Sequence, residues 1–67
     1  MKLYDVVAVD LGSCRVRLIA ENKTKDNADA IMGMAVINRG VDIEFFAVVE
    51  HGTYAKGDKW RTVDALP

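Results

Sequence analysis

The sequence predicts an α+β fold in which three antiparallel strands, in the order 2-1-3, carry one helix on one face of the sheet. Three short segments are rich in Val, Ile and Phe and alternate in side-chain character, which is typical of strands. A longer segment before the third of them repeats its apolar residues at helical spacing. The chain has 67 residues, enough for one small domain. The connections are short, so the helix returns the third strand to the side of the first, and few other topologies remain.

The first two strands are expected to form a hairpin. Residues 3–10 are rich in Val and alternate loosely between two faces, which indicates a strand with little polarity on either side. Gly12 follows in a position that favours a tight turn. Residues 14–21 alternate more regularly and indicate a half-buried second strand. Two strands joined by so short a turn run antiparallel.

The helix is predicted over residues 25–38, because both of its ends carry recognisable residues. Thr24 can cap the first turn with its hydroxyl, and Asp26 lies where the helix dipole favours negative charge. Gly40 is typical of the position after the last turn.

The rest of the chain is predicted to hold one more strand and a tail. Residues 43–50 alternate in side-chain direction and form the third expected strand. Residues 51–67 are expected to be irregular, and a short fourth strand near Val63 is an option. We assign residues 1–67 to a single domain.

The helix has more apolar surface than one sheet covers. One stripe has the spacing of a face that packs on a sheet, and a second stripe lies roughly opposite. The first stripe comprises Ala28, Ile31, Met32, Ala35 and Val36, and the second comprises Ala30, Gly33, Met34 and Ile37.

The sheet is also apolar on both faces. The face expected against the helix comprises Val7, Val9, Val16, Leu18, Phe45 and Val49. The opposite face comprises Tyr4, Val6, Ile19, Phe46 and Val48. Either the tail covers one surplus face, or the surplus marks contact with a second copy or with another protein. A slip of one residue in register would exchange the two strand faces.

Composition and charge argue against several classes of function. The formal net charge is −1, with 9 Lys and Arg against 10 Asp and Glu, which argues against a nucleic-acid binder. Cys14 is the sole cysteine, so no intramolecular disulfide forms, and we expect a buried or half-buried thiol in a cytoplasmic protein. We expect no signal peptide and no membrane span, because the apolar runs are a few residues long.

The titratable residues do not form a recognisable catalytic or metal-binding set, so we expect no enzyme, no cofactor and no metal. His51 with Glu50, Asp58 and Asp64 is a poor set of zinc ligands, and we expect these side chains in solvent. A triad of Ser13, His51 and Asp58 lacks the sequence pattern of a nucleophile elbow.

Residues 6–20 resemble the first phosphate loop of the actin-like ATPases, in which strand, Asp-apolar-Gly-small and strand follow one another. The resemblance implies that Asp10 would help to place a metal ion and that the amides near Gly12 and Ser13 would hold phosphate. The second phosphate loop and the adenosine site of that superfamily are absent. A plain β-hairpin with a Gly turn explains the segment equally well.

Aromatic and basic residues alternate in the tail, at Tyr54, Lys56, Lys59, Trp60 and Arg61. Three interpretations are open. The Trp can pack the tail onto the sheet, the group can anchor a protein partner, or the rings can stack on nucleic-acid bases.

The whole chain resembles the very short β-β-α-β accessory proteins that bacteriophages and other mobile elements encode, among them anti-CRISPR proteins. Small size, the start of the helix at residues 24–31 and the segment 54–60 prompt this resemblance. It implies a stoichiometric inhibitor that covers a site on a larger protein in the host cytoplasm.

The preferred hypothesis is therefore a non-catalytic protein-binding module. Its predicted contact residues are Ala30, Met34, Ile37, Phe46, Tyr54, Trp60 and Arg61. One alternative is a small nucleic-acid-binding domain that uses Arg15, Arg17, Lys56, Lys59 and Arg61 around Tyr54 and Trp60. The other alternative is a structural homodimer.

Overall fold

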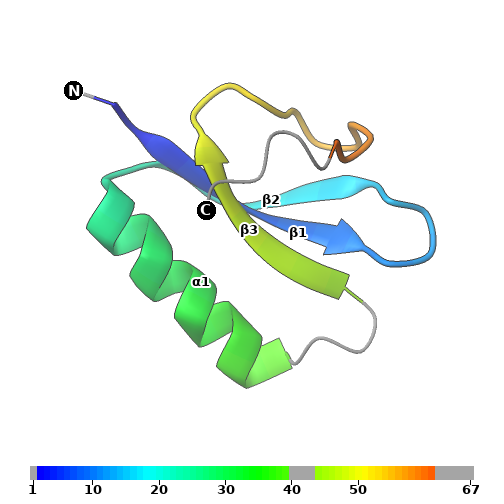
Figure 1. Ribbon diagram of the computed structural model, residues 1–67, viewed down its shortest axis with the longest axis horizontal. Coiled ribbons are helices and arrows are strands. Elements are labelled where there is room, and N and C mark those ends of the chain that lie inside the picture. The colour runs from blue at the N-terminus through cyan, green and yellow to red at the C-terminus, as the bar shows by residue number, and fades with distance from the viewer. Residues whose placement is uncertain (1, 40–43, 62–67) are drawn as a thin grey trace.

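The computed structural model describes residues 2–39 and 44–61, which form a three-stranded antiparallel sheet with one helix on one face (Figure 1). The elements are β1 (Tyr4–Asp10), β2 (Val16–Lys23), α1 (Lys25–Arg39) and β3 (Glu44–Glu50). The strand order is β2-β1-β3. The predicted α+β fold, element order and strand order are therefore confirmed, and each predicted boundary lies within two residues of the observed one.

The β1–β2 hairpin closes through backbone hydrogen bonds at its turn. The Asp10 N–H donates to the Arg15 carbonyl over 3.1 Å, and the Cys14 N–H donates to the Asp10 carbonyl over 2.8 Å. Cys14 has a φ of 61°, which few residues other than glycine adopt. Its side chain is exposed. The prediction of a buried or half-buried thiol is wrong, because Cys14 lies in the hairpin turn, whose residues 11–15 are all exposed.

The pairing of β2 with β1 is irregular at two places. Val6 is opposite Ala20 and Val7 is opposite Leu18, so Ile19 is an extra residue on β2. Such a β-bulge shifts the alternation of the strand that contains it. Ile19 and Ala20 both pack on the helix side, although strict alternation would put Ala20 on the same side as Leu18, which packs on the other face.

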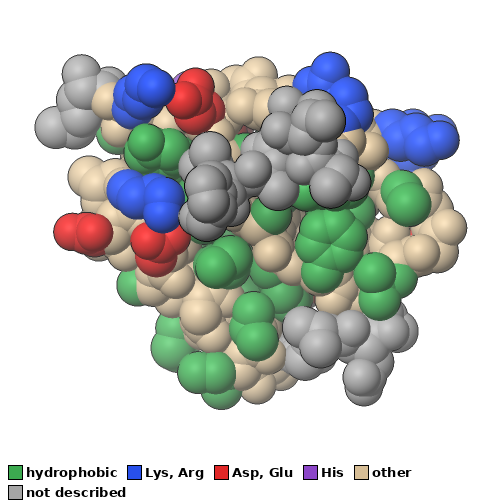
Figure 2. Space-filling model, viewed as in Figure 1, with side chains coloured by type: hydrophobic (Ala, Val, Ile, Leu, Met, Phe, Trp, Pro, Cys, Tyr) green, Lys and Arg blue, Asp and Glu red, His purple; other side chains and the backbone are tan. Residues whose placement is uncertain are grey.

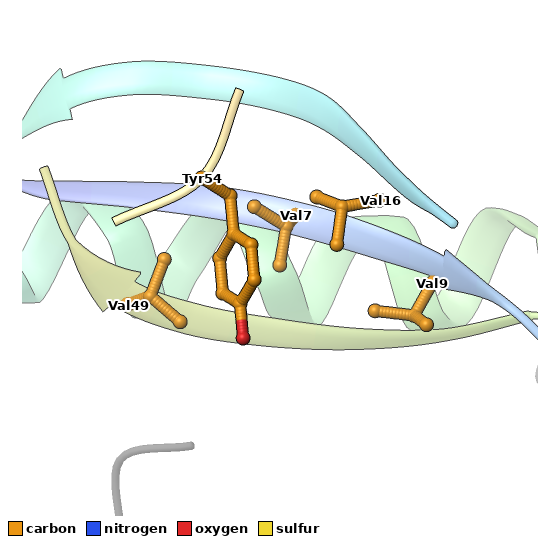
Figure 3. Close-up of a cluster of buried hydrophobic side chains, with 5 residues drawn as sticks. All are labelled: Val7, Val9, Val16, Val49 and Tyr54. Carbon is orange, nitrogen blue, oxygen red and sulfur yellow. The ribbon is translucent and has the colours of Figure 1, made fainter. Parts of the chain in front are cut away.

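The apolar core forms two layers, one on each face of the sheet. On the helix side the buried residues are Val6, Ala28 and Val48. On the other side they are Val7, Val9, Val16, Val49 and Tyr54 (Figure 3). The predicted assignment of the faces is thus reversed. The strands β2 and β3 run in the same direction on either side of β1, and a connection of this kind is nearly always right-handed. The connection therefore selects the covered face, whatever the relative size of the apolar sets.

The tail covers the face that the helix leaves open. It is held by an isolated bridge between Arg15 and Lys59 and by hydrogen bonds of 2.8 Å from the Val16 N–H to the Asp58 carbonyl and from the Trp60 N–H to the Cys14 carbonyl. Of the explanations that the sequence left open for the apolar surplus, cover by the tail holds for this face over residues 51–61. The optional strand near Val63 lies outside the described residues.

Candidate functional site

The orientation of α1 follows from its cap and from its buried stripe. The Thr24 hydroxyl accepts the Asn27 N–H over 3.3 Å, as expected of an N-cap. Ala28 is fully buried, and Ile31 and Met32 are partly buried against the same cluster. With 100° between successive residues, the opposite side of the helix must face away from the sheet.

That opposite side is apolar and open to solvent. We call Ala30, Gly33, Met34 and Ile37 the α1 apolar face. Met34 is 59% exposed and Ile37 is 79% exposed, and Ala30 is also exposed. Figure 2 shows hydrophobic side chains gathered in the region where α1 lies in Figure 1. Val36, predicted in the core stripe, is 39% exposed because it lies about 80° around the helix from Ala28, at the border of that stripe.

Gly33 lies in the middle of this face. An added Cβ at Gly33 would meet no atom within 4 Å, so packing inside the described chain does not require glycine here. Gly in a helix interior costs about 0.8–1.0 kcal/mol relative to Ala. Gly33 therefore lowers the stability of α1, and no contact within the described residues explains why glycine occupies this position.

Apart from Arg39 at its last position, the charged residues of α1 lie at its start. Lys25 and Asp29 form an ion pair of 3.0 Å one turn apart, and Asp26 lies in the first turn. Residues 30–38 carry no charged side chain. The exposed half of the helix therefore offers apolar contact with little desolvation of charge.

The predicted contact residues fall into two groups on opposite sides of the sheet. Phe46 is opposite Ala8, on the same side as α1, and is partly buried. Tyr54 and Trp60 lie on the other side, where they pack on the core and stack on each other at 5.4 Å. Arg61 is exposed, with its guanidinium 5.7 Å from the centre of the Tyr54 ring. Of the predicted contact residues, the structure therefore places Ala30, Met34, Ile37 and Phe46 on the α1 side of the sheet. Tyr54 and Trp60 are not part of the same surface.

Tyr54 and Trp60 pack the tail onto the sheet, as one of the three interpretations predicted. Tyr54 is 5% exposed, and its hydroxyl accepts the Arg61 N–H over 2.9 Å and donates to the Arg61 carbonyl over 3.1 Å. Trp60 also meets Phe45 edge to face at 5.3 Å. Aromatic rings engaged with one another in this way offer bases little surface for stacking.

Two of the cations expected to bind nucleic acid have partners within the domain. Arg17 forms an ion pair of 2.8 Å with Glu44, and Arg15 donates to the Gly57 carbonyl over 3.2 Å. An open hollow of about 280 Å³ is lined by Tyr54, Asp58, Lys59 and Arg61. It contains one carboxylate beside its two cations, which reduces its attraction for phosphate.

The loop that resembles a phosphate loop is the turn of the hairpin. The Asp10 carboxylate accepts the Gly12 N–H over 2.7 Å and the Ser13 N–H over 2.8 Å on one oxygen. These backbone hydrogen bonds lower the pKa of Asp10 below its ordinary value. The same two amides would have to hold phosphate in the actin-like ATPases, and here they bind the side chain of their own turn.

A second polar cluster surrounds Asp5, which is 1% exposed. One of its carboxylate oxygens accepts the Asn22 N–H over 3.0 Å and lies 2.8 Å from His51 Nδ1. The other accepts the Gly52 N–H over 3.2 Å. Asn22 and Gly52 have φ values of 59° and 86°, so the irregularity in β2 and the turn after β3 both direct amides at this carboxylate.

Glu21 completes this cluster, which the sequence analysis missed. One ligand atom from each of Asp5, Glu21 and His51 lies within 4.8 Å of the other two. His51 is exposed, as expected, and its Nδ1 also lies 2.8 Å from the buried Asp5 carboxylate. Its predicted companions lie elsewhere: Glu50 pairs with Lys2 and Asp58 accepts the Ala55 N–H, while Asp64 lies outside the described residues. The sequence does contain one indication of this cluster. Asp5 is a charged residue inside the apolar run of β1, and a buried charge needs partners.

Comparisons with protein-family models, with curated proteins and with solved structures give no match to this chain. Within residues 2–39 and 44–61, no helix has the length and apolar character needed to cross a membrane.

Proposed function

We propose that this chain is a non-catalytic protein-binding module that contacts a larger protein through the α1 apolar face. The observation that carries the proposal is the exposure of Met34 and Ile37, at 59% and 79%, on neighbouring turns of one helix. Adjacent large apolar side chains left open to solvent on a small domain are typical of interaction sites.

The α1 apolar face fits a groove on its partner. Ala30, Gly33, Met34 and Ile37 have the spacing i, i+3, i+4 and i+7 that helices use when they bind in grooves. Met34 can adapt its flexible side chain to the groove wall. Gly33 allows the partner surface to approach the helix backbone.

Area favours a larger partner over a second copy. A standard interface buries about 800 Å² on each partner, roughly a fifth of the 4404 Å² that this chain exposes. Two convex helices in contact along four residues bury much less than that. A concave groove encloses both flanks of the helix, so it can reach this area and can also contact the exposed part of Phe46.

The resemblance to mobile-element inhibitors extends the proposal to the class of partner. On that resemblance we propose a bacterial target, such as a CRISPR component or another defence protein, met in the host cytoplasm. Binding would then inhibit by covering a site stoichiometrically, which requires no catalytic residue in this chain.

The test is a pull-down from bacterial lysate with mass spectrometry, using wild type, Met34→Asp/Ile37→Asp and a matched control. The control is Leu11→Asp, which also places a charge at an exposed apolar residue, in the hairpin turn away from α1. We expect wild type and Leu11→Asp to retain one larger protein, and the double variant to lose it. Purified target and chain should then form a one-to-one complex by light scattering.

Other outcomes select the alternatives. If the double variant melts at the wild-type temperature and still retains the target, the α1 apolar face is not the contact. A wild-type dimer that becomes a monomer in the double variant, with no protein captured, would select the homodimer. A mobility shift of DNA or RNA that disappears as salt rises would select nucleic-acid binding.

A further inference from the structure

We propose that Asp5, Glu21 and His51 form a binding site for one divalent first-row transition metal ion, with Zn²⁺ as the probe. This site is independent of the proposed protein contact, since Asp5 faces the same side of the sheet as Val49, away from α1.

The donor set consists of ligand types that such ions accept. One imidazole nitrogen and two carboxylate oxygens are ordinary ligands of zinc, and three protein ligands leave a fourth position for water. The three residues come from separate parts of the fold, at the start of β1, near the end of β2 and just after β3. His51 is 46 residues from Asp5 in the sequence, so the fold itself brings them together.

The distances suit a metal after small side-chain movements. Ligand atoms around tetrahedral zinc lie roughly 3.4 Å apart, given bonds of about 2.1 Å. The three ligand atoms here lie within 4.8 Å of one another, and the closest pair, His51 Nδ1 and the Asp5 carboxylate oxygen, is 2.8 Å apart. The Glu21 side chain is exposed and has no hydrogen bond or ion pair with another described residue, so its carboxylate can move inward.

Two backbone N–H groups hold Asp5 in place by bonds that a metal ion would leave intact, whereas the hydrogen bond between Asp5 and His51 Nδ1 would be exchanged for bonds to the metal. The Asn22 and Gly52 amides donate to its carboxylate from two different turns. Hydrogen bonds of this kind around a ligand fix its orientation and strengthen metal binding. The buried carboxylate oxygens of Asp5 have hydrogen-bond partners without a metal, so the chain should fold without the ion and bind it afterwards.

The experiment titrates Zn²⁺ into the untagged chain by isothermal calorimetry, with thermal melting of each variant in chelator as a folding control. The variants are Glu21→Gln and His51→Gln, with Asp26→Asn as the matched control because it also removes one exposed carboxylate. Cys14→Ser is included because an exposed thiol can bind zinc by itself.

We expect one zinc per chain in wild type, Asp26→Asn and Cys14→Ser, and at least about tenfold weaker binding in Glu21→Gln and His51→Gln. If His51→Gln does not fold, Glu21→Gln decides alone, because Glu21 takes no part in the hydrogen bonds around Asp5. Equal affinity in wild type and Glu21→Gln, loss in Cys14→Ser, or no saturable binding in wild type would each overturn the proposal.

Discussion

Asp5 and Asp10 lie near opposite ends of β1, and both carboxylates accept backbone N–H groups. Asp10 bonds to amides two and three residues away, within its own turn. Asp5 bonds to amides 17 and 47 residues away. A turn formed around Asp, Gly and Ser can be predicted from the sequence, because its partners are local. The partners of Asp5 depend on which strands pair and where β2 is irregular, so sequence spacing does not reveal them.

Asp10 gives the domain a contribution to stability that depends on pH. Its pKa in the folded state is lowered by the Ser13 and Gly12 amides, so this stabilisation is present above the unfolded pKa of about 3.9 and is lost as pH falls through the folded pKa. We expect Asp10→Asn to be less stable than wild type at pH 5 and the difference to shrink on acidification. Urea unfolding between pH 5 and pH 2 measures this, and a difference that stays constant with pH would contradict it.

At the scale of elements, local sequence determines which segments form helix or strand, and the connections between them determine which face of the sheet α1 covers. The start of α1 follows directly from Thr24, and the strands follow from side-chain alternation. Apolar content does not show which face of the sheet α1 covers. Val6 lies on the helix side and Val7 on the tail side, and both are fully buried. The bulge at Ile19 could not be predicted from the sequence, because the side chains of β2 before it alternate regularly. Its position is set by the pairing with β1.

Gly33 offers a test of α1 by itself. Because a Cβ at this position meets no neighbour, we expect Gly33→Ala to raise the free energy of unfolding by about 0.8–1 kcal/mol. Ala30→Gly, one turn earlier on the same exposed face, should lower it by a similar amount. Urea unfolding followed by circular dichroism measures both. A destabilised Gly33→Ala would mean that the helix is packed at this point in a way that the described residues do not show.

The same variant links α1 to the proposed function. If a partner surface lies against Gly33, the added methyl group should weaken binding while the domain itself becomes more stable. Stability and binding would then change in opposite directions.

At the scale of the whole molecule, the sheet is covered on one face by α1 and on the other by the aromatic tail (Figures 1 and 3). The sequence predicted the helix and left three interpretations of the tail open. Tyr54 is part of the core and Trp60 packs against it. The valines on the face opposite α1 need cover, and the tail is the apolar segment that provides it. The exposure of Met34 and Ile37 follows, since covering the second face uses the tail and leaves α1 with nothing to cover it among the described residues.

Tyr54 should therefore be among the most sensitive positions in the chain. Replacing a buried aromatic residue by Ala costs about 3–5 kcal/mol, and a domain of this size has a total stability of only about 3–10 kcal/mol. We expect Tyr54→Ala to be largely unfolded in urea titrations and Tyr54→Phe, which loses only the bonds to Arg61, to lose about 1 kcal/mol. Met34→Ala is the matched control on the exposed side and should change stability by no more than about 0.5 kcal/mol. If Tyr54→Ala and Met34→Ala unfold at the same urea concentration, the tail is not a structural layer, and its aromatic residues become available again as partner contacts.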